Sequence, residues 1–191
     1  STCWRSSSSS PCRPPAAVAD RAMGRRPDRR LARRTARLKA VQALYQIEMT
    51  GAAPDAVVTE FVSHRLAEPV DDTALPEADS RFFAELVRGT ASERGELDDM
   101  IAAVLKEGWA VDRLEATLAA ILRAGTWELA NRHDIPVRAT ISEFTDIASA
   151  FMGERETALA NGVLNRIAKE LRPDEFEKAA PDTLPETGSG R

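Results

Sequence analysis

Apolar residues recur every three or four positions along most of the chain, the spacing that places them on one face of an α-helix. No stretch alternates between apolar and polar residues for long enough to be a β-strand. The pattern therefore predicts an all-α fold of about seven helices. The expected helices cover approximately residues 29–49, 54–66, 79–105 (one bent helix or two, because Gly89 and Gly95 interrupt it), 113–131, 140–152 and 155–171.

Short polar signals mark where several of these helices are expected to begin and end. Asp28 is the expected N-cap of the first helix, and Gly51 marks its end. Pro54 suits the first turn of the second helix. Asp112 is expected to cap the helix that follows it, and Thr140-Ile-Ser-Glu143 matches a capping box, which predicts a helix start at Thr140.

The two ends of the chain differ in composition from the middle. Residues 1–28 form a basic Ser/Pro-rich leader and residues 172–191 an acidic Pro-rich tail, and we expect both to be disordered around one domain at 29–171. Both cysteines, Cys3 and Cys12, lie in the leader, so no disulfide staples the core, and the cytoplasm is the expected location. No apolar run approaches the ~18–20 residues needed to cross a bilayer.

The first predicted helix carries a stripe of arginines. At 100° per residue, Arg30, Arg33, Arg34 and Arg37 fall on one side, which Tyr45 continues toward the C-terminus. No acidic residue offsets this stripe, so repulsion between its i,i+4 arginines and the helix dipole both disfavour it. A bound polyanion would relieve both effects, and we therefore favour phosphate binding over a merely solvated face.

The charge of the chain is divided unevenly. Residues 1–50 have a net charge of +8 and the remainder −12, for a total of −4. A basic end joined to an acidic body suggests a polyanion at one end and a basic protein against the other.

Residues that could perform catalysis or bind metal are few and scattered. His64 and His133 are isolated, and the Asp98-Asp99 pair points in different directions on a helix. Arg132 reads as an ordinary surface charge. Leu184-Pro-Glu-Thr-Gly188 matches the sortase pentapeptide but lacks the apolar segment and basic tail of a sorting signal, so it is interpreted as incidental or as an appended tag. We predict a protein that is not an enzyme and has no cofactor and no metal.

Several short strings, in their order and spacing, resemble the NusB family of bacterial transcription antitermination factors. The resemblance covers roughly residues 29–171. The strings are Ala32-Arg-Arg-Thr-Ala-Arg-Leu-Lys-Ala-Val-Gln-Ala-Leu-Tyr45, Phe83-Ala-Glu-Leu-Val-Arg-Gly89, Ala120-Ile-Leu-Arg-Ala-Gly-Thr-Trp-Glu-Leu129, Asp134-Ile-Pro136, Ile141-Ser-Glu143, Ile147-Ala148, Phe151 and Ala160-Asn-Gly-Val-Leu164.

The resemblance implies a helical domain that binds the boxA element of nascent ribosomal RNA through its first helix. It further implies pairing with the ribosomal protein NusE, in a complex that lets RNA polymerase read through terminators. Arg33, Arg34 and Arg37 match the family's helix-one arginines, and Tyr45 its tyrosine, although Thr35 stands where an arginine is often seen.

The sequence does not decide the roles of three further residues or exclude other functions. Arg155 and Leu159 stand where some relatives have an acid and a phenylalanine that contact RNA. Tyr45 could stack on a base or be a core tyrosine with its hydroxyl at the rim. The alternative functions are an RNA-binding accessory domain of a ribosomal RNA cytosine methyltransferase and a helical adaptor that binds only protein. A homodimer that covers the arginine face is a further possibility.

Overall fold

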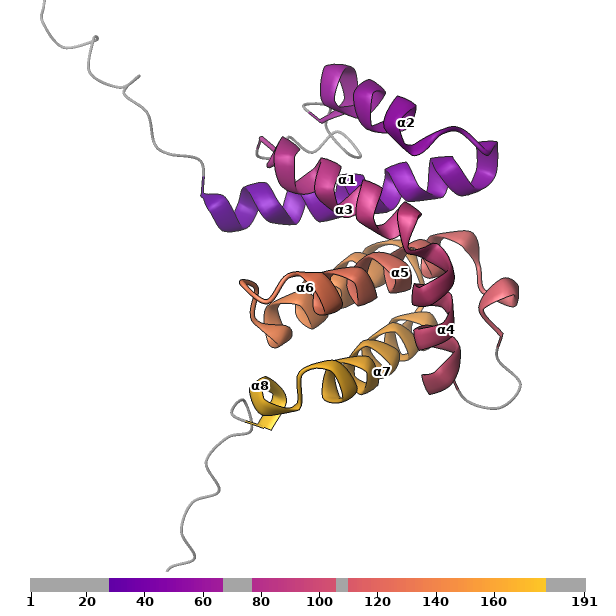
Figure 1. Cartoon of the computed structure of the whole chain (residues 1–191), viewed down its shortest axis with the longest axis vertical. Coiled ribbons are helices and arrows are strands. Elements are labelled where there is room, and N and C mark those ends of the chain that lie inside the picture. The colour runs from indigo at the N-terminus through magenta and orange to yellow at the C-terminus, as the bar shows by residue number, and fades with distance from the viewer. Residues whose placement is uncertain (1–27, 67–76, 106–109, 178–191) are drawn as a thin grey trace, which may run out of the picture.

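The computed structural model describes residues 28–66, 77–105 and 110–177 (Figure 1). These residues contain helices and no strand, which confirms the predicted all-α class. The rest of the predicted leader and the pentapeptide near the C-terminus lie outside the described residues. The helices are α1 (Arg29–Thr50), α2 (Pro54–Glu60), α3 (Ser80–Ser92), α4 (Arg94–Val104), α5 (Ala116–Asn131), α6 (Val137–Phe151), α7 (Glu154–Leu171) and α8 (Pro173–Glu177), with a π-helical turn at Phe61–Arg65 and a 3₁₀ turn at Val111–Arg113.

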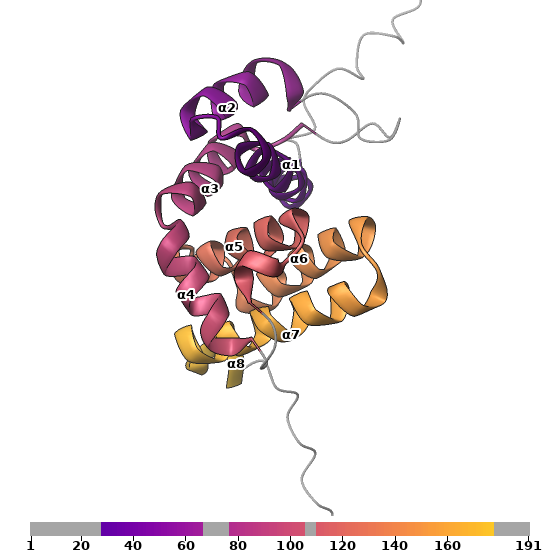
Figure 2. The ribbon, with the colours of Figure 1, turned by 90° about the vertical axis from the view of Figure 1, so that its right-hand side faces the viewer.

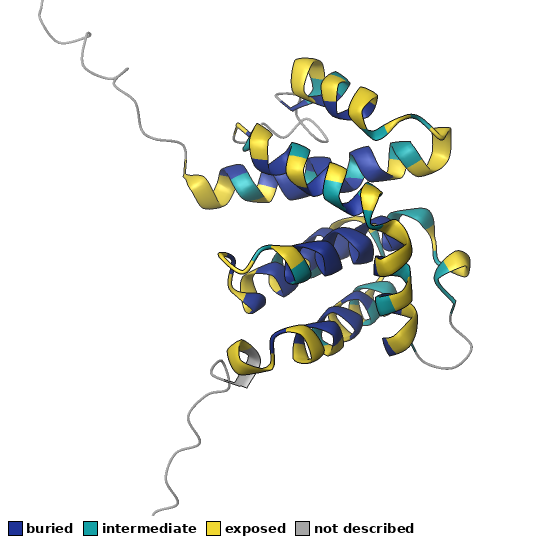
Figure 3. Ribbon diagram, in the orientation of Figure 1, coloured by how far each residue is buried: buried dark blue, intermediate teal, exposed yellow. Residues whose placement is uncertain are grey.

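The helices form two groups that meet at α5. α1, α2 and α3 pack on one another, while α5, α6 and α7 form the second group (Figure 1). α1 contacts α5 and α6, and α4 passes from the first group to the second along one side (Figure 2). α5 is buried on all sides from Leu118 to Leu129 (Figure 3), so the hydrophobic core surrounds it.

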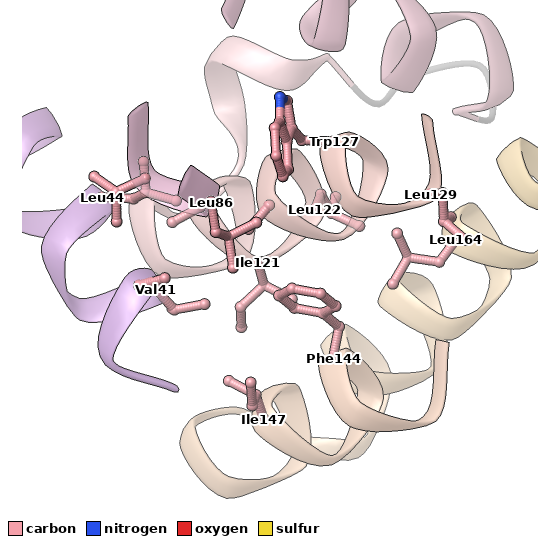
Figure 4. Close-up of a cluster of buried hydrophobic side chains, with 14 of the residues drawn as sticks. Val41, Leu44, Leu86, Ile121, Leu122, Trp127, Leu129, Phe144, Ile147 and Leu164 are labelled. Carbon is pink, nitrogen blue, oxygen red and sulfur yellow. The ribbon is translucent and has the colours of Figure 1, made fainter. Parts of the chain in front are cut away.

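The core is assembled from large apolar side chains of both groups. Val41 and Leu44 of α1 and Leu86 of α3 meet Ile121 of α5, and Phe144 of α6 closes the other side (Figure 4). These are the positions that the helical periodicity of the sequence predicts to be buried. Burying each such side chain contributes about 1.5–3 kcal/mol, which makes this core the main stabilising feature of the fold.

Most of the predicted start and stop signals are confirmed. The Asp28 carboxylate accepts a hydrogen bond from the backbone N–H of Arg30 at 3.0 Å, and Gly51 follows α1 with φ of 66°, a left-handed conformation that favours glycine. Pro54 begins α2, and the Asp79 carboxylate caps α3 by accepting from Phe82 N–H at 3.0 Å.

Two predicted helix starts are wrong. α6 begins at Val137 rather than Thr140, because the Thr140 hydroxyl points into the core and donates to Glu128 Oε1 at 2.7 Å instead of capping. Asp112 lies in the 3₁₀ turn, and α5 starts four residues later at Ala116.

Two further boundaries differ from the simplest expectation. The stretch from Asp79 forms two helices, but they separate at Glu93 and neither glycine is the break. Gly89 instead lies against the indole ring of Trp127, where a Cβ atom would overlap the ring. The expected disorder after residue 171 is wrong for residues 172–177, because Arg172 is buried and α8 follows it.

Candidate nucleic-acid interface

The first two turns of α1 present arginine side chains to solvent. Arg29 and Arg30 are exposed, and neither guanidinium makes an ion pair within the described part of the chain. Arg34 is 55% exposed, with Asp146 of α6 at 3.5 Å and Glu143 at 3.9 Å. The exposed pair with Asp146 contributes about 0–1 kcal/mol, so Arg34 can exchange that carboxylate for another anion at little cost. Glu143 is only 19% exposed and its Oε2 atom is buried, so it stays beside Arg34.

Arg37 has the opposite environment, and its predicted role as an exposed phosphate ligand is wrong. Its side chain is 5% exposed, and its guanidinium holds the fully buried Glu128 carboxylate with hydrogen bonds of 2.7, 2.9 and 3.2 Å. Thr140 adds a further bond to the same carboxylate. The i+3 step from Arg34 turns Arg37 toward α5, where the only acid of a long apolar run requires a cation.

Arg33 is intermediate between these two cases. Its Nη2 atom lies 3.3 Å from Asp134 Oδ2, and its guanidinium lies 5.3 Å from the centre of the Phe82 ring. The Arg33 Nε atom is buried without an acceptor among the described residues, so an anion would reach it only if the side chain moved. The Arg33 side chain is 16% exposed in all.

Three guanidinium groups surround Phe82 of α3. Those of Arg33, Arg37 and Arg132 lie 5.3, 5.3 and 5.1 Å from its ring centre, a cation–π arrangement. Arg132, which the sequence assigns to the surface, binds both oxygens of Asp134 at 2.8 and 3.0 Å and Glu85 at 2.8 Å. The cluster is thus balanced in charge, because Glu85, Glu128 and Asp134 match its three cations.

The electrostatics of this cluster centre on Asp134. Hydrogen bonds from Arg132, together with those from Arg33, hold the pKa of the Asp134 carboxyl well below its usual range. The same bond to Asp134 raises the pKa of Arg132. Asp134 is therefore a carboxylate that two arginines share, and it keeps the stronger, two-pronged partner if Arg33 leaves.

The remaining predicted site residues lie elsewhere on the surface. Tyr45 is 41% exposed on the C-terminal half of α1, so it is not a core tyrosine and its ring is available to a ligand. Arg155 and Leu159 of α7 line a groove of about 380 Å³ against the end of α4, where Arg166 donates to the Val104 carbonyl at 2.8 Å. α1 packs on α2, α3, α5 and α6 and does not bring its arginines to this groove.

Sequence reasoning missed the residues that position the arginines. Glu128 was the available signal, since a single acid in the apolar run from Leu118 to Leu129 demands a buried cation. No comparable signal marked Phe82 or Asp134, because the arginines around Phe82 lie 45 to 50 residues away and Arg33 lies 101 residues from Asp134.

The described residues contain neither a candidate metal centre nor a helix suited to a membrane. No group of three or more His, Cys, Asp or Glu side chains there is placed to hold a metal ion. None of the described helices combines the length and apolar character needed to span a bilayer. His64 and His133 are both exposed, on the π-helical turn and between α5 and α6.

These features define an all-helical domain that presents the arginine-rich end of one helix. A sequence model of the NusB family matches residues 34–169. The transcription antitermination protein NusB of Bradyrhizobium diazoefficiens is 45% identical over 145 residues, which cover 75% of this chain and 87% of the relative. That of Sphingopyxis alaskensis is 45% identical over 140 residues, 73% of this chain and 94% of the relative. The chain belongs to the NusB family.

Solved structures are similar to the same part of the chain. T. maritima NusB superposes with a TM-score of 0.62 at 30% identity and covers 75% of this chain and 96% of its own. A crystal structure of antitermination factors NusB and NusE in complex with double-stranded RNA gives a TM-score of 0.60 at 25% identity, over 72% of this chain and 96% of that chain.

Proposed function

We propose that this protein is a transcription antitermination factor that binds the boxA element of nascent ribosomal RNA through the exposed end of α1. The observation that carries the proposal is the exposure of Arg30 and Arg34, one turn apart. Arg30 makes no ion pair within the described part of the chain, and Arg34 contacts its two carboxylates only at 3.5 and 3.9 Å. Membership of the NusB family, whose relatives are antitermination proteins and not enzymes, supports it.

The proposed contacts differ in kind along the helix. Arg30 and Arg34 bind phosphate groups, and Arg33, oriented by the contact of its Nη2 atom with Asp134, adds a third contact through its other Nη donors. Tyr45 stacks on a base, an interaction worth about 1–3 kcal/mol. Arg155 and Leu159 form a second RNA-binding patch on α7, where an arginine supplies a phosphate contact of its own.

The proposed protein partner is the ribosomal protein NusE. A related NusB has been crystallised with NusE and RNA. The net charge of −12 on residues 51–191 suits a basic ribosomal protein. The resulting unit acts within the RNA polymerase antitermination complex in the cytoplasm, and a homodimer would be its free form.

The two alternative functions have less support. The antitermination relatives are matched over 87% and 94% of their own lengths, which favours them over an accessory domain of a longer methyltransferase. A protein-only adaptor leaves the exposed arginine pair without a ligand, and it predicts no affinity for RNA.

A titration with fluorescent boxA RNA, with and without NusE, tests the proposal. We expect wild-type protein to bind, NusE to strengthen binding, and Arg30→Gln/Arg34→Gln to weaken it by tenfold or more at low salt, since each charged contact is worth about 1.5–3 kcal/mol at most. Arg113→Gln removes an exposed cation from the 3₁₀ turn and serves as the control. Equal affinity of the double variant and the control would exclude α1 from the site, and sedimentation of the same samples reports on the homodimer.

A further inference from the structure

Arg172 joins the end of α7 to the loop between α5 and α6. Its side chain is 3% exposed although it follows the last residue of α7. Nη2 donates to the Ile135 carbonyl at 2.9 Å and the His133 carbonyl at 3.4 Å, and Nη1 donates to the Arg132 carbonyl at 3.4 Å. The Arg172 guanidinium therefore donates to three backbone carbonyls within residues 132–135.

Glu175 of α8 holds Arg172 in this position. Its carboxylate accepts from Arg172 Nη2 at 2.6 and 2.7 Å and from Nε at 3.1 Å. The hydrogen bond from Arg172 also lowers the pKa of Glu175. A planar guanidinium can bind a carboxylate with one edge and carbonyls with another, which a lysine ammonium cannot reproduce.

The loop that Arg172 holds is the one that carries the partners of Arg33. Asp134 projects from it toward α1 and accepts from Arg33 at 3.3 Å, while Arg132 binds Asp134 and reaches Glu85 and Phe82 of α3. The described backbone bonds of this loop are those from Arg132 to Glu128 and from Ile135 to Arg132, and the buried Ile135 side chain anchors its end in the core. The contacts run without a gap from Glu175 through Arg172 and the loop to Arg33.

We infer that Arg172 is a positioning residue for RNA binding, which sets the orientation of Arg33 through the loop at residues 132–135. The inference rests on the proposed function, and it concerns residues beyond 169, where the family match ends. It makes the segment at 172–177 part of the binding machinery although it contributes no contact to the RNA.

Measuring the effect of Arg172→Ala on RNA affinity in two backgrounds, wild type and Arg33→Gln, separates a positioning role of Arg172 from a purely stabilising one. If Arg172 acts through Arg33, Arg172→Ala weakens binding of boxA RNA by about threefold to tenfold in the wild-type background and by less than twofold when Arg33 is already glutamine. A purely structural loss would lower affinity in both backgrounds alike. Arg113→Ala is the control for the change in charge, and Arg172→Lys tests whether charge alone is sufficient.

Measurements on the full chain without RNA test the link from Arg172 to the loop separately from the proposed function. In Arg172→Ala and Arg172→Lys we expect faster amide exchange at residues 133–135 and an Asp134 carboxyl pKa, followed by carbon NMR, that moves up toward its ordinary value. Unchanged loop exchange and an unchanged Asp134 titration would overturn the inference even if RNA binds. Equal losses in both backgrounds, or full binding by Arg172→Lys, would also overturn it, whereas failure of wild-type protein to bind RNA would overturn the proposed function alone.

Discussion

Arg34 and Arg37 lie one turn apart on α1 and have opposite environments. Arg34 reaches solvent beside the half-exposed Asp146 and the mostly buried Glu143, while Arg37 is buried against Glu128 and Thr140. Two residues of the same type therefore serve different purposes: the first can bind a ligand and the second holds α1 on α5. The difference follows from burial, because a buried charge cannot leave its partner without a large cost in free energy.

This contrast predicts very different effects of one substitution at the two positions. Arg37→Met should lower the free energy of unfolding by about 3–5 kcal/mol, since it leaves the Glu128 carboxylate buried and unpaired. Arg34→Met should change it by about 1 kcal/mol or less. Urea denaturation measures both, and adding Glu128→Gln to Arg37→Met should recover part of the loss. Similar, small effects at the two positions would contradict the assignment of Arg37 as a structural residue.

At the scale of elements, the packing of α3 on α5 depends on the absence of a side chain. Gly89 gives the indole of Trp127 room to lie against the α3 backbone, and the indole N–H donates to Glu93 at 3.2 Å. The indole therefore packs at Gly89 and bonds at Glu93, where α3 ends and α4 begins. A helical glycine, usually unfavourable, is here required by a close approach.

Replacing the two glycines of this region should have effects of opposite sign. Gly89→Ala should destabilise the protein by about 1–3 kcal/mol, because the new methyl group overlaps the Trp127 ring. Gly95→Ala should stabilise it by up to about 1 kcal/mol, because nothing lies within 4 Å of the new methyl group and alanine favours a helix. Thermal unfolding of the two variants, with tryptophan fluorescence as a second signal, measures these changes in stability. If Gly89→Ala left the stability unchanged, the Trp127 ring of α5 would not lie as close to the α3 backbone as described.

The boundaries of the elements also indicate what local sequence can and cannot predict. Asp28 and Gly51 act on residues within a few positions, so their signals are visible in the sequence and hold in the structure. Thr140 matches a local capping pattern, but Glu128 offers its hydroxyl a buried partner and the helix begins earlier. Tertiary contacts outweigh local signals where a buried charge must be satisfied.

At the scale of the whole molecule, the sequence predicts which helix carries the candidate site but not how many of its arginines are available. The helical period places Arg30, Arg33, Arg34 and Arg37 on one side, yet the second group of helices covers part of that side. Arg37 is held in a buried ion pair with Glu128, and Arg33 forms an ion pair with Asp134. Composition likewise assigns Arg172 to a tail, because its three carbonyl partners are 37 to 40 residues away.

The salt dependence of RNA binding tests the central claim, that the exposed arginines Arg30 and Arg34 near the start of α1 bind phosphate. Each phosphate contact with a single strand contributes about −0.7 to the slope of log K against log salt. We predict that the slope for Arg30→Gln/Arg34→Gln is about 1.4 units shallower than for wild type, while Arg113→Gln leaves the wild-type slope unchanged. A double variant with the same slope as wild type would contradict the account.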